Sequence, residues 1–126
     1  MQITGTAPND ITIEGITFTK QATRSTNGPA RALRVFVDLN SLTLNDVVVE
    51  YAAVNNLEIN GDINTLTIDE CTFNYAGTNG LMCPGDIGSG SITDSNFDHN
   101  GRLDVWASGM HFFGSVSYTH LTLPTN

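Results

Sequence analysis

The feature that most constrains this chain is an internal repeat with a 24-residue period. Four segments align on one apolar position, whose number steps by 31, 24 and 24 through Ile13, Leu44, Ile68 and Ile92. A second short apolar segment follows each of these at residues 33–35, 57–59, 81–83 and 105–107. Since this second series steps by 24 throughout, the long first step indicates a seven-residue insertion between Ile16 and Leu33.

A third apolar column, at Leu39, Ile63 and Ile87, keeps the same period. Three short strands in each of several equal repeats are typical of a parallel β-solenoid, in which neighbouring coils bury one another's apolar face. No segment shows apolar residues at helical spacing. The sequence therefore predicts an all-β solenoid of about four 24-residue coils, with three short strands per coil and no significant helix.

Alternation along the strands predicts which side chains face the interior. Ile11, Ile13, Ile16 and Phe18 alternate with polar residues and are expected to point inward. One inward stack is expected to contain Phe18, Val49, Phe73 and Phe97. The two cysteines, Cys71 and Cys83, fall in inward columns and are interpreted as small core residues.

Composition limits the partners of the chain. The formal net charge is −8, with 5 basic and 13 acidic residues, which argues against nucleic acid because phosphate binding needs clustered Lys and Arg. No apolar run has the length of a transmembrane segment. The first residues show no signal-peptide pattern, so either the protein is cytoplasmic or the true start is missing.

The coil LTIDECTFNYAGTNGLMC and its companions resemble the recurring coil of the right-handed parallel β-helix proteins, the pectin-lyase-like superfamily, over residues 10–113. The resemblance implies right-handed coiling and a secreted or cell-surface parent protein associated with polysaccharide. The paired aspartates and G-H-G of its polygalacturonases are absent, and so is the D-P-H of its alginate epimerases. Since one fold hosts many activities, this resemblance predicts fold more sharply than function.

The end of the chain departs from the repeat. A fifth coil is expected from Gly114, but residues 116–125 read VSYTHLTLPT, which resembles a translated sequencing adapter. We therefore expect residues 1–115 to be a fragment of a longer β-helix that lacks its neighbouring coils, and residues 116–126 to be a non-native tail. Uncapped ends would favour aggregation. The alternative is a natural C-terminal strand, since this stretch is rich in β-formers.

A column of carboxylates is a candidate metal site. Asp46, Glu70 and Asp94 recur at the bend between two strands, with Gly15 in the preceding coil. Carboxylates stacked about 4.8 Å apart repel one another, and Ca²⁺ would relieve the repulsion. The alternative is ordinary turn chemistry, in which such residues hydrogen-bond the backbone of a bend.

A second column holds Lys20, Tyr51, Tyr75 and His99. Tyr51 and Tyr75 are candidates for stacking on sugar rings, and Asp98 with His99 is a candidate acid–base pair. The alternative is a surface ladder of like side chains that stabilise one another.

The inserted loop, residues 20–32, is basic on an acidic protein. Arg24, Arg31 and Arg34 in and beside it are candidates for binding the carboxylates of an acidic polysaccharide, and the alternative is a solvated loop. We therefore expect acidic-glycan binding or lyase-like cleavage. The alternative function is a non-catalytic, adhesin-like or structural surface solenoid.

Overall fold

The computed structural model describes residues 1–6, 9–19, 31–101, 109–112, 114 and 116–121; the side chains of Thr19, Arg31 and residues 116–121 lie outside that description. The described chain is all-β and contains no helix, and so none that could cross a membrane. Its strands are β1 (Gln2–Ile3), β2 (Asp10–Glu14), β3 (Thr17–Thr19), β4 (Arg31–Val35), β5 (Leu39–Asn45), β6 (Val48–Glu50), β7 (Asn55–Ile59), β8 (Ile63–Asp69), β9 (Thr72–Asn74), β10 (Leu81–Cys83), β11 (Ile87–Thr93), β12 (Met110–Phe112) and β13 (Val116–Leu121).

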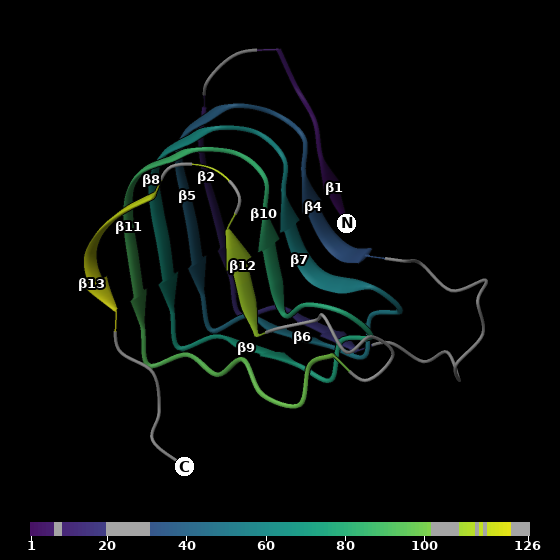
Figure 1. Cartoon of the computed structure of the whole chain (residues 1–126). Helices are drawn as coiled ribbons and strands as arrows, with labels where there is room; N and C mark the ends of the chain where they lie inside the picture. Colours follow the sequence, from purple (N-terminus) through teal and green to yellow (C-terminus); the bar gives the residue numbers. More distant parts are fainter. Residues whose placement is uncertain (7–8, 20–30, 102–108, 113, 115, 122–126) are drawn as a thin grey trace.

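These strands form three parallel sheets. Sheet A has the order β1-β4-β7-β10-β12, sheet B the order β2-β5-β8-β11-β13, and sheet C the order β3-β6-β9. The chain visits A, B and C in turn and returns to each sheet one strand further on, so successive repeats lie side by side (Figure 1). This confirms the all-β, solenoid-like arrangement with three short strands per repeat.

The 24-residue register holds through the middle of the molecule. Leu33 pairs with Leu57 in sheet A, and Leu39 pairs with Ile63 in sheet B. Ile13 pairs with Leu44, which confirms the longer first step across the insertion. Constant register keeps each column on one face of its sheet.

The prediction for the fourth repeat of sheet A was wrong. Leu81 pairs with Met110, so the step is 29 instead of 24, and β12 takes the place expected for residues 105–107. Cys83 accordingly pairs with Phe112 instead of Ala107. Five additional residues, the difference between 29 and 24, lie between Asn100 and Gly109, because Asn100 still bonds Ala76 at a spacing of 24. An apolar V-W-A at the expected spacing had hidden this insertion.

The final strand also has a different register from the expected one. Val116 pairs with Ile87 and Leu121 with Ile92, whereas Val116 was expected opposite Ile92. The pairing of β13 with β11 shifts twice along its length. Residues 116–121 therefore extend sheet B, and the resemblance of their codons to an adapter stays a prediction.

The interior is made by the apolar columns. Val49 and Phe73 are fully buried, and the Phe73 ring stacks on Phe97 with centroids 5.2 Å apart, as the sequence predicts. Ile13 is buried too, whereas Ile16, in the same column as the buried Val47, is 39% exposed. It precedes β3, which forms one edge of sheet C, and no described strand covers it from that side.

Candidate functional site

The outer face of sheet A carries a buried carboxylate. Glu58 lies between the inward-facing Leu57 and Ile59 and so belongs to the outer face, yet its side chain is only 6% exposed. Asn55 Nδ2 donates to one carboxylate oxygen and Asn60 Nδ2 to the other, each at 2.9 Å. A buried charge of this kind needs such partners, because its desolvation is costly.

Arg34 supplies the opposing charge. Its Nη2 atom lies 3.7 Å from Glu58 Oε1, and its guanidinium stands 4.2 Å from the centre of the Phe36 ring. Ion pairing and cation–π contact together hold the guanidinium in one orientation. The side chain is 31% exposed, and its buried Nε atom has no hydrogen-bond partner within the described residues.

Sequence reasoning found Arg34 but missed Glu58. The signal was present, because the two residues are one repeat apart and therefore adjacent in sheet A. Met82 pairs with Glu58 in the next repeat, and His111 pairs with Met82 in the one after, so a single column runs through Arg34, Glu58, Met82 and His111. We call Arg34, Phe36, Glu58, Asn55 and Asn60 the arginine site.

The other basic candidates are less defined. Arg24 lies outside the described residues. The backbone of Arg31 begins β4 and pairs with Asn55, while its side chain is outside the description. Of the three candidate arginines, Arg34, beside the inserted loop, is therefore the one whose side chain is described.

The second predicted column forms a stacked ladder. Tyr51 and Tyr75 lie with centroids 4.8 Å apart and planes within 4°, and Tyr75 stacks on His99 at 5.1 Å. All three residues have positive φ, between 54° and 63°, at the corner that follows sheet C. Stacking offsets the strain of this left-handed conformation, which bulky residues rarely adopt. Because both faces of Tyr75 are covered, a sugar would meet its edge instead of its face. Lys20, the first member of the predicted column, lies outside the described residues.

Asp98 and His99 do lie together. His99 Nδ1 is 2.8 Å from Asp98 Oδ2, and the backbone N–H of His99 donates to Asp98 Oδ1 at 2.8 Å. Both side chains are exposed to solvent, 63% for His99 and 47% for Asp98. The pair has the geometry of an oriented base. Within the described residues it makes no hydrogen bond or ion pair with Arg34.

The carboxylate column has the geometry of a turn. Asp46, Glu70 and Asp94 have φ values of 51°, 50° and 47°, and Gly15 has 63° at the same corner between sheets B and C. Backbone N–H groups at this corner donate to backbone carbonyl oxygens of the next repeat, as the N–H of Asp46 does to the carbonyl oxygen of Asp69. Among the described residues, no group of three or more His, Cys, Asp or Glu side chains could hold a metal ion. This geometry agrees with the alternative of ordinary turn chemistry, and Ca²⁺ binding by these three carboxylates stays a prediction.

The two thiols belong to the core. Cys71 and Cys83 are both buried and unbonded to each other. Burial raises the pKa of the Cys71 thiol above its usual value, and burial raises the pKa of Cys83 to about 11. A thiol that stays protonated is a poor nucleophile and a poor metal ligand. The interpretation of both as small core residues is confirmed.

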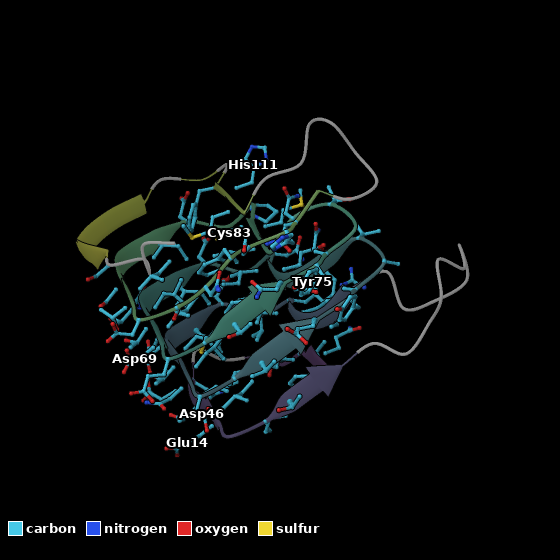
Figure 2. The ribbon with its side chains drawn as sticks, turned by 90° about the horizontal axis from the view of Figure 1, so that it is seen from below. Glu14, Asp46, Asp69, Tyr75, Cys83 and His111 are labelled. Carbon is cyan, nitrogen blue, oxygen red and sulfur yellow. The ribbon has the colours of Figure 1, made fainter. Side chains whose placement is uncertain are left out.

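The features lie on different sides of the molecule. Figure 2 shows Glu14, Asp46 and Asp69 along one side, apart from Tyr75 and His111. The arrangement offers a fixed guanidinium at one place and an exposed imidazole–carboxylate pair at another. Comparison with protein families, with curated proteins and with solved structures gives no match for this chain.

Proposed function

We propose that this chain is part of a right-handed parallel β-helix of the pectin-lyase-like type that binds acidic polysaccharide outside the cell. The observation that carries the proposal is the guanidinium of Arg34, which is held by Glu58 and Phe36 and whose side chain is 31% exposed. A guanidinium presents parallel N–H donors that match a carboxylate, which makes a uronic acid residue the best-fitting ligand. A regular solenoid suits an extended polymer because it offers a long surface.

Glu58 has a defined part in this proposal. Its carboxylate, fixed by two asparagine amides, orients Arg34 and also competes with a bound uronate for the same positive charge. The site is therefore expected to bind weakly and to depend on salt, since the local charge is nearly balanced.

The test is a titration with polygalacturonate, using a neutral glucan as the control ligand. Arg34→Gln should weaken polygalacturonate binding by about tenfold or more, because charge-assisted hydrogen bonds are lost. Glu58→Gln should strengthen it, since the amide keeps the shape of the side chain and removes the competing charge. Equal effects of the two variants, or wild-type binding that matches the neutral glucan, would refute the proposal.

Cleavage is a separate step from binding. A lyase removes the C5 proton beside the uronate carboxylate, the glycosidic oxygen leaves C4, and a C4–C5 double bond forms. In such a step Arg34 would neutralise the carboxylate. Asp98 and His99 form the candidate base, and no contact between described residues joins this pair to Arg34. Incubation with polygalacturonate, followed by measurement of unsaturated product, decides whether the protein cleaves its ligand as well as binding it.

A second candidate function is a non-catalytic surface solenoid. It is favoured by outward columns whose side chains hydrogen-bond the next repeat. Asp38 and Asp62 each accept a hydrogen bond from the backbone N–H of the aspartate one repeat later, at 2.9 Å. Such ladders stabilise the stack of repeats and call for no ligand. Absence of binding to any uronate polymer in the titration above would favour this function.

A further inference from the structure

The outer face of sheet B carries a regular array of hydroxyl groups. In each of β5, β8 and β11, the same two outward positions hold Ser or Thr, and the register aligns them across the three strands. We call this set the hydroxyl array; it consists of Ser41, Thr43, Thr65, Thr67, Ser89 and Ser91.

The array is regular in two directions. β5, β8 and β11 pair without a register shift and lie side by side as nearly parallel arrows in Figure 1. Neighbouring strands repeat at about 4.8 Å, and alternate residues along a parallel strand repeat at roughly 6.6 Å. The inward residues beneath, including Leu42, Leu66 and Ile92, are fully buried and hold the strands in place.

Most of these hydroxyls have no partner among the described side chains and backbone groups. Ser41 donates to Asp10 at 2.8 Å. Within the described part of the chain, the hydroxyls of Thr43, Thr65, Thr67, Ser89 and Ser91 make no hydrogen bond. A hydroxyl both donates and accepts, so this face presents hydrogen-bonding capacity that solvent or a ligand must satisfy.

The chemistry of the array selects the kind of ligand. It contains no charged residue and no aromatic ring, so it fits neither an ion nor the face of a sugar. Threonine methyl groups lie among the hydroxyls, which gives a surface that is partly apolar. A ligand that matches it must be neutral, rich in hydrogen bonds and periodic in two directions.

We infer that the outer face of sheet B binds crystalline water, that is, an ice surface. Hexagonal ice has oxygen repeats of similar length in two perpendicular directions of its prism face. A rigid array of hydroxyl and methyl groups orders first-shell water in the same pattern. The protein then adsorbs to the crystal, because the pattern of this ordered water matches the ice lattice. This inference does not depend on glycan binding at sheet A.

The test is ice-affinity partition of the whole chain, with ice-recrystallisation inhibition as a second readout. Wild-type protein should concentrate in slowly grown ice and keep ice grains small. Thr67→Tyr, at the centre of the array, should lose both activities because the ring lifts the face away from the ice. Thr72→Tyr makes the same change on the outer face of sheet C and should keep them.

Circular dichroism and thermal melting establish that each variant is folded. Should Thr67→Tyr unfold, Thr65→Tyr at the more exposed neighbouring position replaces it, and Thr67→Val, which keeps the shape of the side chain, should reduce both activities. The inference is overturned if wild-type protein enters ice no more than serum albumin does, or if Thr72→Tyr loses activity equally. Binding to microcrystalline cellulose without binding to ice would also overturn it, in favour of a crystalline glycan.

Discussion

The outer faces of sheets A and B satisfy their polar groups in opposite ways. On sheet A, Glu58 and Arg34 lie in adjacent strands, pair with each other and draw in two asparagine amides. On sheet B, Thr43, Thr67 and Ser91 lie equally close in adjacent strands, but their hydroxyls make no hydrogen bond to any described residue. The same repeat thus builds one face that is held together by its polar groups and one that is available to a ligand.

The difference shows what a column does in a repeating fold. Adjacent repeats place equivalent residues about 4.8 Å from each other. Opposite charges at that distance neutralise each other, whereas two short hydroxyl side chains directly opposite each other are kept apart by the strand spacing; a hydroxyl opposite an aspartate does bond it, as Ser41 bonds Asp10. Side-chain length and charge therefore decide whether a column closes on itself or stays open.

The largest expected effect comes from breaking the closed face. Glu58→Ala should lower the free energy of unfolding by about 3 kcal/mol, since it leaves Arg34 and two asparagine amides without their acceptor. Exposure of part of the guanidinium to water limits the loss. Thr67→Ala on the open face should cost less than about 1 kcal/mol. Urea denaturation of both variants measures the contrast, and equal costs would mean that the faces are held alike.

The inner side of sheet A gives the next effect. With the pKa of the Cys83 thiol raised from 9.0 to about 11, its thiolate fraction at pH 8 falls about a hundredfold, and alkylation of native protein should slow by that factor. Because the folded pKa is the higher one, the associated stability is present below pH 9 and is lost as pH rises through 11. Mass spectrometry after iodoacetamide treatment measures the rate, with protein in urea as the control. Equal rates in both would contradict burial.

The corner that joins sheet A to sheet B gives a smaller effect. A Cβ at Gly85 would lie 2.1 Å from the Gly61 carbonyl oxygen, so Gly85→Ala should destabilise by roughly 2 kcal/mol through overpacking. Gly15→Ala is the matched control, because a Cβ added at Gly15 would have open space around it. This substitution should cost only the strain of a positive φ, about 1 kcal/mol. Thermal melting ranks the two. A reversed order would show that the corner is not packed as described.

The corner at the other end of sheet B gives the smallest effect. Glu70→Asn should raise the free energy of unfolding by about 0.5 kcal/mol, since Asn tolerates the left-handed conformation better than Glu does. Thermal melting with and without Ca²⁺ is the measurement. A rise in melting temperature when Ca²⁺ is added to wild type, and its loss in Glu70→Asn, would establish Ca²⁺ binding by this column.

Most of the fold could be predicted from the sequence, because one constant period in three apolar columns leaves one arrangement of the strands. What could not be predicted is where the period breaks. Residues 105–107 and β12 both offer an apolar segment, and local pattern does not choose between them. The choice depends on where in the chain the five additional residues are inserted, which the apolar pattern does not show.

The site was less predictable for a related reason. Arg34 attracted attention as a basic residue on an acidic chain, but its partner Glu58 appears in the sequence as one acid among thirteen. That Arg34 and Glu58 are neighbours becomes clear only when the 24-residue period is used to align outward residues as well as inward ones. The same reasoning aligns Thr43, Thr67 and Ser91, which the search for charged and aromatic residues passed over.

If the two outer faces are independent surfaces, one crossed binding experiment separates them. Wild type, Arg34→Gln and Thr67→Tyr are each measured for polygalacturonate binding and for partition into ice. We expect Arg34→Gln to lose polygalacturonate binding and keep ice binding, and Thr67→Tyr to do the reverse. Loss of both ligands in either folded variant, or of neither, would show that the two faces are not independent.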